Sequence, residues 1–309
     1  MRVYRGTRDG AKVPVALTIG NFDGIHLGHQ AMLQRLREAA LRDGLPAAVL
    51  TFEPHPRELV TPASAPARLT SIREKLELLK SHGIDQVRVA RFNRAFASLS
   101  PQQFIQDILV KDLKIRWLLV GDDFRFGAQR GGDITLLKHA SERFGFALES
   151  MHGIEVAGER ASSTGVREAL ASADFARATR LLGRPYRISG RVGHGKKLGR
   201  ELGFPTANIA LKRKRSPLAG IYAVKLHGIH AQPLPAVASI GVRPTVMEGA
   251  AAVLEIHVLD FNQDIYRRHV SVEFLHKLRD EEKYPDVESL RRQIAIDVEQ
   301  ARNYLNCNL

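Results

Sequence analysis

Cysteine is almost absent from this chain of 309 residues, because the only one, Cys307, lies close to the C-terminus. A single thiol forms neither an internal disulfide nor a zinc site built from several cysteines, so the sequence excludes both as sources of stability. No apolar run approaches the roughly 18 residues of a membrane-spanning helix, and residues 1–10 lack the apolar segment of a signal peptide. We therefore expect a cytoplasmic protein with no membrane partner.

Acidic residues are also scarce, since 33 Asp and Glu stand against 46 Lys and Arg, for a net charge of +13. Such an excess favours an anionic partner, either nucleic acid, phosphorylated small molecules or a membrane surface. The densest basic run, Lys212 to Arg215, precedes Ser-Pro and is most simply a solvated loop; an RNA or phosphate contact is the alternative. Because no aromatic-rich RNA-binding signature is present, we expect no obligatory nucleic-acid partner.

The length of the chain, about twice that of a typical domain, indicates two globular units. In the first half, apolar runs typical of strands alternate with helical patterns, which predicts an α/β fold with a parallel sheet and crossover helices. The expected strands are residues 14–20, 47–52, 115–121 and 146–151, and the expected helices are residues 31–44, 71–83, 100–109 and 164–183.

After Gly183 the pattern changes to alternation with a period of two, punctuated by Gly and Pro, which predicts a small antiparallel β-barrel. The expected strands are residues 186–192, 221–228, 235–242, 253–261 and 269–275. Residues 286–305 close the chain as an amphipathic helix, with Leu290, Ile294, Val298 and Ala301 on one face. These patterns predict two domains, residues 1–182 and residues 183–309.

The turn Gly-Asn-Phe-Asp-Gly-Ile-His-Leu-Gly-His, residues 20–29, follows the first expected strand and opens a helix. A glycine-rich turn at the carboxyl edge of a parallel sheet presents backbone N–H groups and the positive end of a helix dipole, which favours phosphate. His26 and His29, three residues apart, are expected to share one face of the first helical turn. A zinc site needs a further ligand nearby, and the spacing matches neither a dinucleotide-binding motif nor a Walker loop.

Two further segments carry hydroxyl and basic groups suited to phosphate. The string Ser-Ser-Thr-Gly-Val-Arg, residues 162–167, offers hydroxyls and an arginine at a helix N-terminus, where an ordinary helix cap is the alternative. Residues 190–209 combine clustered glycines, basic side chains and the string Gly-Phe-Pro-Thr-Ala-Asn. Thr206 and Asn208 offer the hard oxygen ligands that Mg²⁺ prefers, although composition alone also fits an ordinary glycine-rich hairpin.

The string His26-Leu27-Gly28-His29 matches the H-x-G-H signature of the nucleotidyltransferase superfamily, and the longer turn resembles the bacterial bifunctional riboflavin kinase/FAD synthetase family. Residues 120–127 resemble the flavin-side loop of FAD synthetases, and residues 203–208 resemble the riboflavin kinase signature. The chain departs from the family pattern at Ala161, Val246 and Arg267, which concerns local packing and turn shape.

The resemblance implies a Rossmann-like nucleotidyltransferase domain followed by a barrel kinase domain, and it implies roles for residues in each. In the first domain, His26 and His29 would be catalytic, and the other residues would bind ATP (Gly20, Phe22, Asp23, Gly24, Gly28, Ser163, Thr164, Arg167) or the flavin (Asp123, Phe124, Arg125). In the second, Glu255 would be the catalytic base, Thr206 and Asn208 would hold Mg²⁺, Arg279 would contact the flavin, and ATP would be bound by Gly193, Gly195, Lys196, Gly199 and Arg200.

By that resemblance, the substrates are riboflavin, FMN and ATP. The kinase domain phosphorylates riboflavin to FMN, and the nucleotidyltransferase domain adenylylates FMN to FAD with release of pyrophosphate. Two alternatives stay open at this point: a single-activity nucleotidyltransferase with a degenerate barrel, and a non-catalytic nucleic-acid-binding protein that uses Lys212 to Arg215. Self-association is left open by the sequence.

Overall fold

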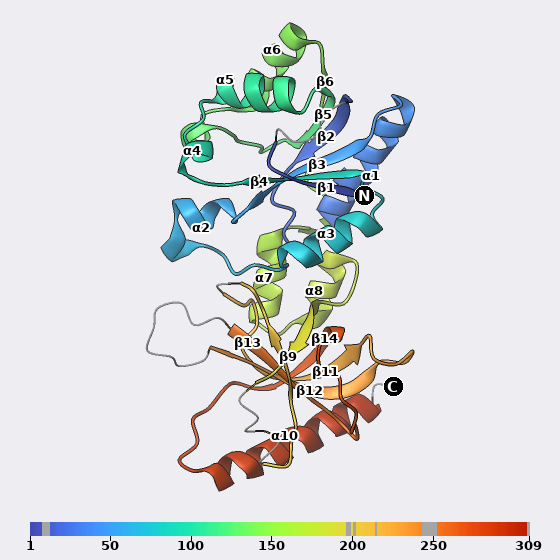
Figure 1. Ribbon diagram of the computed structural model, residues 1–309, viewed down its shortest axis with the longest axis vertical. Coiled ribbons are helices and arrows are strands. Elements are labelled where there is room, and N and C mark those ends of the chain that lie inside the picture. The colour runs from blue at the N-terminus through green and yellow to red at the C-terminus, as the bar shows by residue number, and fades with distance from the viewer. Residues whose placement is uncertain (8–12, 196–198, 200–201, 214, 243–251, 308–309) are drawn as a thin grey trace. The chain divides into compact units, whose positions relative to one another are not determined.

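The structure is a computed structural model that describes the chain apart from residues 8–12, 196–198, 200–201, 214, 243–251 and 308–309 (Figure 1). The chain forms two compact units, of which the first comprises Met1–Pro66 with Lys75–Ser162 and the second comprises Ala67–Glu74 with Ser163–Leu309. Residues 67–74 and 163–182 thus group with the barrel. The functional division at residues 182 and 183 stays a prediction.

The first unit is built on a six-stranded parallel sheet in the order β1-β4-β3-β2-β5-β6, as the alternating pattern predicts. Its strands are β1 Arg2–Arg5, β2 Val15–Ile19, β3 Ala47–Glu53, β4 Gln86–Arg91, β5 Ile115–Gly121 and β6 Ala147–Met151. Its helical segments are α1 Leu27–Arg42, α2 Pro56–Val60, η1 Pro62–Ser64, α4 Arg94–Ala97, α5 Pro101–Gln103, η2 Phe104–Asp112, η3 Ala128–Arg130 and α6 Ile134–Phe144. The two-stranded ribbon of β7 Glu155–Val156 and β8 Glu159–Arg160 follows, and α3 Ile72–Ser81 begins in the second unit and continues into the first.

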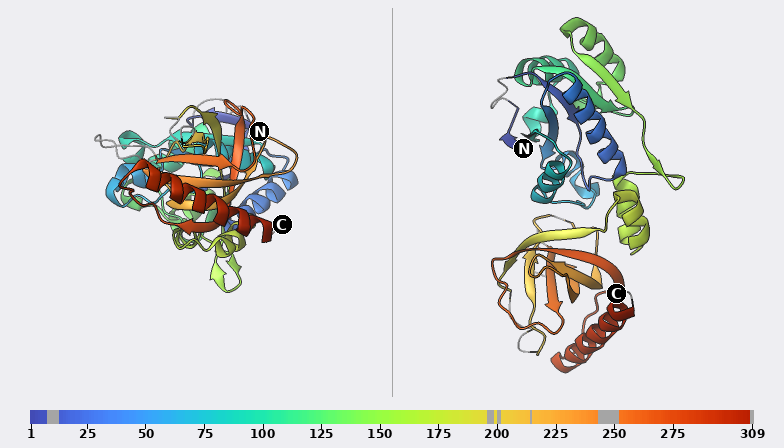
Figure 2. Two further views of the ribbon diagram at one scale, coloured as in Figure 1. Left: turned by 90° about the horizontal axis from the view of Figure 1, so that it is seen from below. Right: turned by 90° about the vertical axis from the view of Figure 1, so that its right-hand side faces the viewer.

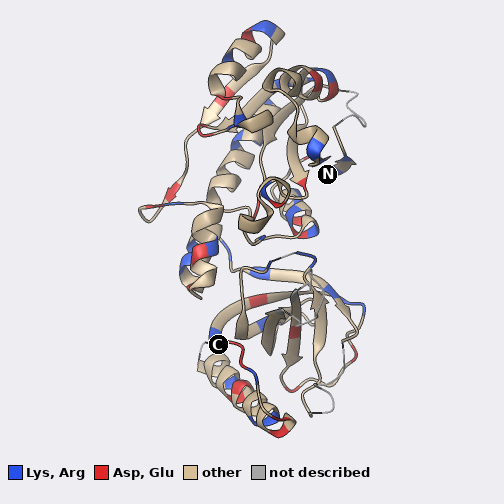
Figure 3. Ribbon diagram, turned by 90° about the vertical axis from the view of Figure 1, so that its left-hand side faces the viewer, with Lys and Arg blue, Asp and Glu red and all other residues tan. Residues whose placement is uncertain are grey.

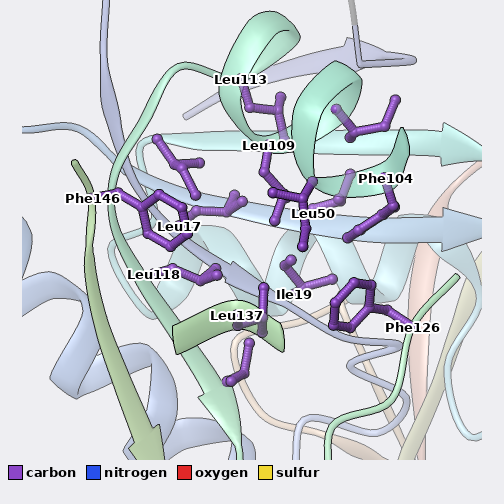
Figure 4. Close-up of a cluster of buried hydrophobic side chains, with 14 of the residues drawn as sticks. Leu17, Ile19, Leu50, Phe104, Leu109, Leu113, Leu118, Phe126, Leu137 and Phe146 are labelled. Atoms are coloured by element: carbon purple, nitrogen blue, oxygen red, sulfur yellow. The ribbon is translucent and has the colours of Figure 1, made fainter. Parts of the chain in front are cut away.

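Both faces of this sheet are buried, because successive strand residues point to opposite sides and both sets are apolar. On one face, Leu17, Leu50 and Leu118 pack with helical side chains that include Leu109 and Leu137 (Figure 4). On the other face, strand residues pack against α1 and the later turns of α3, through Leu33, Leu36 and Leu79 among others. The result is a three-layer α/β unit with a core on each side of the sheet.

The strand order places the topological switch point beside β2. From β2 the chain passes through α1 to β3 on one side, while β5 pairs with β2 on the other side. In open parallel sheets, ligands bind in the crevice outside the carboxyl ends of the strands at such a point. The turn that follows β2 and the loop that follows β5 therefore flank the expected binding crevice.

The second unit contains a closed antiparallel barrel in the order β10-β13-β12-β11-β14-β9. Its strands are β9 Arg187–Gly193, β10 Ala207–Ala210, β11 Gly220–His227, β12 Leu234–Val242, β13 Ala252–Val258 and β14 His269–Arg279, and its helices are α7 Ser163–Ala171, α8 Phe175–Leu182 and α10 Val287–Cys307. Figure 2 shows α10 lying along the outside of the barrel, where Ala301 and Leu305 pack on Ile221 and Val237. The predicted barrel and closing helix are both confirmed.

Charged residues of both signs are interspersed along α10, as expected of a helix that buries one stripe and exposes the rest (Figure 3). Within the described part of the chain, every helix is too short or too polar to cross a bilayer.

The single helix predicted over residues 164–183 is wrong, because the chain forms α7 and α8 with a break between them. Ala173 adopts a positive φ of 56°, and the side chain of Asp174 accepts a hydrogen bond from the backbone N–H of Arg177. Asp174 is thus a strong N-cap, and it starts a second helix inside a stretch with continuous helical periodicity.

The interpretation of Lys212 to Arg215 as a solvated loop is wrong for Arg213. The side chain of Arg213 is 0% exposed and forms an ion pair with Glu74, whereas Lys212 and Arg215 are exposed. Lys214 lies outside the described residues. Arg213 therefore has a structural partner and is not available to a nucleic-acid surface.

Candidate active sites

The turn after β2 brings His26 and His29 together. His26 is the N-cap of α1, and its Nδ1 accepts a long hydrogen bond of 3.4 Å from the backbone N–H of His29. The two imidazoles stack with ring centroids 3.7 Å apart and an angle of 26° between their planes. Because Nδ1 of His26 is an acceptor in this geometry, the proton of its neutral ring belongs on Nε2.

The backbone of this turn is held in an unusual conformation. Phe22 and Ile25 have positive φ angles of 47° and 43°, and Gly24 has a φ of 83°. Phe22 is only 1% exposed, and its ring centroid lies 4.9 Å from that of His29. This buried aromatic contact stabilises the conformation of the turn. Non-glycine residues in this region of φ cost energy and cluster at functional sites, which agrees with the role predicted for the turn.

Gly28 is needed for close packing rather than for its backbone angles. A Cβ at this position would lie 3.1 Å from the carbonyl oxygen of Ala161 and 3.2 Å from the ring of His26. The segment that leads to Ser162 thus passes directly over the start of α1. Asp23, which is 4% exposed, completes the buried part of the turn.

The surroundings of His29 perturb its pKa. Burial, the neighbouring His26 and the charge of Lys75 all lower the pKa of His29 well below its usual value. Its buried Nδ1 has no hydrogen-bond partner among the described residues. At neutral pH His29 is therefore an uncharged imidazole, with one N–H that donates and one ring nitrogen that accepts. A ligand can form a hydrogen bond with this buried ring.

The loop after β5 places the three predicted flavin-side residues at the same edge of the sheet. Asp123 accepts from Arg160 at 3.0 Å, and Arg125 pairs with Asp133 at 3.3 Å. Phe124 is half-buried and stacks on Phe126 with centroids 5.6 Å apart. The charged pairs fix the loop, and the phenylalanine presents an aromatic face.

An aromatic tract continues from this loop across the ends of three strands, and the sequence analysis missed its other members. Consecutive rings lie 5.4 to 6.2 Å apart between centroids. The tract consists of Phe52, Phe92, Phe96, Phe104, Phe126 and Phe124. Phe52 is the penultimate residue of β3 and Phe92 follows β4, so only the strand order brings these side chains together.

Ser163, Thr164 and Arg167 lie in the first two turns of α7, in the second unit. Thr164 is exposed, and the guanidinium of half-buried Arg167 donates from Nε to the carbonyl oxygen of Ala67 over 2.7 Å. The hydroxyls thus stand at a helix N-terminus, as predicted. Their role as an ATP clamp stays a prediction.

On the barrel, Asn208 and Glu255 lie directly opposite each other on β10 and β13. Ser239 on β12 faces Glu255 from the other side, so an amide, a carboxylate and a hydroxyl form a row across three neighbouring strands. Asn208 is 7% exposed, and its Oδ1 has no hydrogen-bond partner among the described residues. The row is the barrel's candidate catalytic surface.

Two described glycines that follow β9, Gly195 and Gly199, lie close to Asn208 and Thr206 respectively. A Cβ on Gly195 would lie 2.4 Å from Nδ2 of Asn208, and a Cβ on Gly199 would lie 2.4 Å from the carbonyl oxygen of Phe204 and 3.4 Å from Oγ1 of Thr206. Both predicted glycines therefore lie against the predicted metal ligands, where no side chain fits. Gly193 pairs with Asn208 on the adjoining strand, and Lys196 and Arg200 lie outside the described residues.

A second carboxylate, which the sequence analysis missed, lies beside Glu255. Glu281 hydrogen-bonds to Ser239, and burial raises its pKa, an effect that Arg279 and Ser239 oppose and the charge of Glu255 reinforces. Arg279 itself forms a bidentate pair with Asp297 of α10, with both N···O distances 2.7 Å. Arg279 thus contacts a buried carboxylate in this structure, and its predicted flavin contact stays a prediction.

A pocket of about 430 Å³ opens next to Thr206. Its walls include Val192, Ile256 and Val258, and Tyr266 at its rim packs against the ring of His194 with centroids 4.0 Å apart. A pocket with both apolar and polar walls, the latter including Asn262 and Asp264, fits a planar, partly polar ligand such as a nucleotide.

Two family models match this chain, one described as FAD synthetase over residues 9–165 and one described as riboflavin kinase over residues 182–305. Proteins described as bifunctional riboflavin kinase/FMN adenylyltransferase are similar over nearly the whole chain. The protein from Escherichia coli (strain K12) is 48% identical over 98% of both chains, and that from Pseudomonas fluorescens is 51% identical over 92% of this chain and 91% of its own.

A solved structure also matches along its full length. A chain from Streptococcus pneumoniae, whose structure is described as that of a macrolide-efflux protein, is 31% identical with a TM-score of 0.77, covering 98% of this chain and 99% of that one. Its description differs from those of the curated relatives, and it supports the arrangement of strands and helices described above.

Proposed function

Because this chain belongs to the bifunctional riboflavin kinase/FMN adenylyltransferase family, we propose that its barrel unit phosphorylates riboflavin and that its parallel-sheet unit adenylylates the resulting FMN. The observation that carries this division is the presence of one constellation in each unit. The stacked pair of His26 and His29 lies in the first unit, and the row of Asn208, Glu255 and Ser239 lies in the second.

In the barrel, Glu255 accepts the proton of the 5′-hydroxyl of riboflavin while that oxygen attacks the γ-phosphorus of ATP. The bond between the γ-phosphorus and the bridging oxygen breaks, and ADP leaves. Glu255 suits this task because it stands on a strand of the closed barrel beside Asn208, where its position is fixed by the cross-strand pairing. The pocket beside Thr206 is suited to the nucleoside of ATP.

The residues around this row fit a magnesium ion. The buried Oδ1 of Asn208, which has no hydrogen-bond partner among the described residues, and the hydroxyl of Thr206 are hard oxygen donors. A Mg²⁺ site built from few protein ligands and substrate phosphates needs no cluster of carboxylates. Bound Mg²⁺ neutralises charge on the transferring phosphates. The chain's own contribution is to hold these two oxygens beside Gly195 and Gly199.

In the parallel-sheet unit, a phosphate oxygen of FMN attacks the α-phosphorus of ATP, the bond to the β-phosphate breaks, and pyrophosphate leaves. No protein nucleophile is needed, because the attacking phosphate is already ionised near neutral pH. His26 and His29 donate hydrogen bonds to phosphate oxygens on which charge increases in the transition state. The positive end of α1 acts on the same phosphates.

The aromatic tract supports a flavin site at the same sheet edge. Phe124 and Phe52 are partly exposed ends of a larger buried cluster, and rings of this kind stack on a flat isoalloxazine.

Since both reactions use ATP, we place them in the cytoplasm, where ATP is made available.

The decisive experiment is chromatography of flavins after the purified chain is incubated with riboflavin, ATP and Mg²⁺. FMN should increase first and then decrease as FAD forms. FMN without FAD would contradict adenylylation in the first unit, and FAD from supplied FMN but not from riboflavin would support the single-activity nucleotidyltransferase with a degenerate barrel. Absence of both flavin products, together with salt-dependent RNA binding, would support the nucleic-acid alternative.

A further inference from the structure

Glu281 is a second carboxylate beside Glu255 that the mechanism above does not use. It lies between β14 and α10, and the residue as a whole is exposed. Its carboxyl end nevertheless lies against β12, because a Cβ on Gly241 would be 2.7 Å from the carboxyl carbon and 2.8 Å from Oε2 of Glu281. The carboxylate therefore occupies the space that a side chain at position 241 would fill.

This position puts Glu281 on the same face of the barrel as Glu255. Ser239 and Gly241 are alternate residues of β12 and point to the same side of the sheet. Since Ser239 lies directly opposite Glu255, position 241 is a diagonal neighbour of Glu255. Diagonal neighbours are about 7–8 Å apart, and long side chains reach across that separation. Both carboxylates can therefore contact the same substrate molecule.

The two ends of the row at Glu255 differ in their chemistry. At the β10 end, Asn208 and the nearby Thr206 offer neutral oxygen atoms beside closely packed glycines, which suits Mg²⁺ and phosphate. At the β12 end, the hydroxyl of Ser239 is joined by the negative charge of Glu281. A carboxylate repels phosphate but accepts strong hydrogen bonds from hydroxyl groups. The β12 end is therefore suited to the alcohol substrate and not to ATP.

The contacts of Glu281 leave its carboxylate able to accept from a ligand. Ser239 hydrogen-bonds to it, and a carboxylate offers about four acceptor positions. The neighbouring Arg279 donates to both carboxylate oxygens of Asp297 over 2.7 Å and to the carbonyl oxygen of Asp280 over 2.9 Å. The guanidinium is thus held by other acceptors, while a hydroxyl that reaches Glu281 finds a charged acceptor at an exposed site.

We propose that Glu281 and Ser239 bind the secondary hydroxyls of the ribityl chain of riboflavin, so that Glu281 makes the barrel specific for a polyhydroxylated alcohol. The proposal rests on the kinase function proposed for the barrel. When the terminal hydroxyl of the chain lies at Glu255, with the phosphates on the β10 side, the remaining hydroxyls extend toward β12. A site built to hydrogen-bond such hydroxyls rejects an alcohol that lacks them.

The test uses two variants and two substrates. Glu281→Ala removes the carboxylate, whereas Gly241→Ala keeps it but places a methyl group in the space that it occupies. Glu282→Ala removes an exposed carboxylate one residue further along and is the control. The substrates are riboflavin and an analogue with a hydroxypentyl chain, which keeps the terminal hydroxyl but lacks the secondary hydroxyls. The kcat/KM for phosphorylation is measured for each pair by flavin chromatography.

Glu281→Ala should lower kcat/KM for riboflavin about 10- to 100-fold, and Gly241→Ala should lower it in the same direction. With the analogue, which is already a poor substrate of the wild-type chain, both variants should differ from the wild type by less than about twofold. Glu282→Ala should behave as the wild-type chain. Conversion of supplied FMN to FAD should change less than about twofold in all three variants.

Equal losses with riboflavin and the analogue would overturn the proposal, because Glu281 would then support Glu255 or the fold instead of binding hydroxyls. Unchanged kcat/KM for riboflavin in both site variants would overturn it as well. If Glu281→Ala does not fold, the same comparison of substrates in Gly241→Ala decides. Failure of the wild-type chain to phosphorylate riboflavin is a different result, since it overturns the function of the barrel itself.

Discussion

Arg213 and Glu74 form a buried ion pair in the second unit, with Nη2 of Arg213 2.9 Å from Oε2 of Glu74. Glu74 also accepts hydrogen bonds of 2.6 Å from the backbone N–H groups of Ser71 and Ser189. Arg213 donates from Nη1 to the carbonyl oxygens of Arg68 and Leu69. Both charges are thus compensated, and the pair joins residues 67–74 to the start of the barrel.

Removing one member of this pair leaves the other charge buried without compensation. We predict that Glu74→Gln lowers the free energy of unfolding of the second unit by about 3–5 kcal/mol. The measurement is urea unfolding of the full chain, with the loss of FMN-forming activity as the probe for that unit.

The control is Glu38→Gln, which disrupts an exposed pair in the first unit, with Arg35 3.6 Å away. It should cost less than about 1 kcal/mol, because exposed ion pairs contribute little. If both substitutions lowered the free energy of unfolding by the same amount, Arg213 and Glu74 would not compensate each other's buried charge as described.

Strand β5 was predicted because apolar residues occupy all of its buried positions. Strand β4 was missed because its buried positions include Gln86 and Arg88. The guanidinium of Arg88 lies 3.8 Å from the centre of the Tyr4 ring, so an arginine fills a core position through a cation–π contact. Such a residue interrupts the pattern of a buried strand, and only its tertiary partner explains it.

The sequence predicted the parts of the site whose residues are close together in the chain. It missed the contacts between residues that only the fold brings together. The turn with His26 and His29 is continuous in sequence. By contrast, Glu74 and Arg213 are separated by 139 positions, and Lys75 reaches Thr51 across 24. No periodicity connects residues so far apart, so a basic run looked solvated although one of its members is buried.

The lowered pKa of His29 predicts a pH dependence of stability. The unfolded chain binds a proton at this residue below a pH of about 6.5, whereas the folded chain resists protonation until a lower pH. Acidification therefore favours the unfolded state, and this contribution to stability falls as the pH decreases below about 6.5, with a slope of at most about 1.4 kcal/mol per pH unit.

The measurement compares the wild-type chain with His29→Gln in urea at several pH values from 5 to 8. The difference between their free energies of unfolding should be constant above a pH of about 7 and should change in favour of the variant as the pH decreases. A difference that is independent of pH would contradict a neutral, desolvated His29.

The Oδ1 of Asn208 has no hydrogen-bond partner in the part of the chain that the structure describes, which predicts a specific metal defect when this side chain is removed. Asn208→Ala should raise the Mg²⁺ concentration needed for FMN formation by at least about tenfold, because a ligand oxygen is lost. The control is Asn303→Ala on the exposed side of α10, which should behave as the wild-type chain. A normal magnesium requirement with reduced activity would assign Asn208 to packing of the glycine-rich loop instead.

A substitution in the site of one unit should abolish only the reaction of that unit, because the stacked histidines and the row at Glu255 each lie within one unit. His29→Ala should stop the conversion of FMN to FAD while riboflavin is still phosphorylated, so that FMN accumulates. Glu255→Gln should stop FMN formation while supplied FMN still becomes FAD. Each defect should exceed about 100-fold, since both residues act on the reacting groups.

Exposed residues of the same types provide the matched controls: His139→Ala on α6 and Glu299→Gln on α10 should leave both reactions unchanged. Flavin chromatography of the four variants with riboflavin and then with FMN as substrate gives the answer directly. Loss of both reactions in either site variant, with the controls active, would mean that the two chemistries share residues.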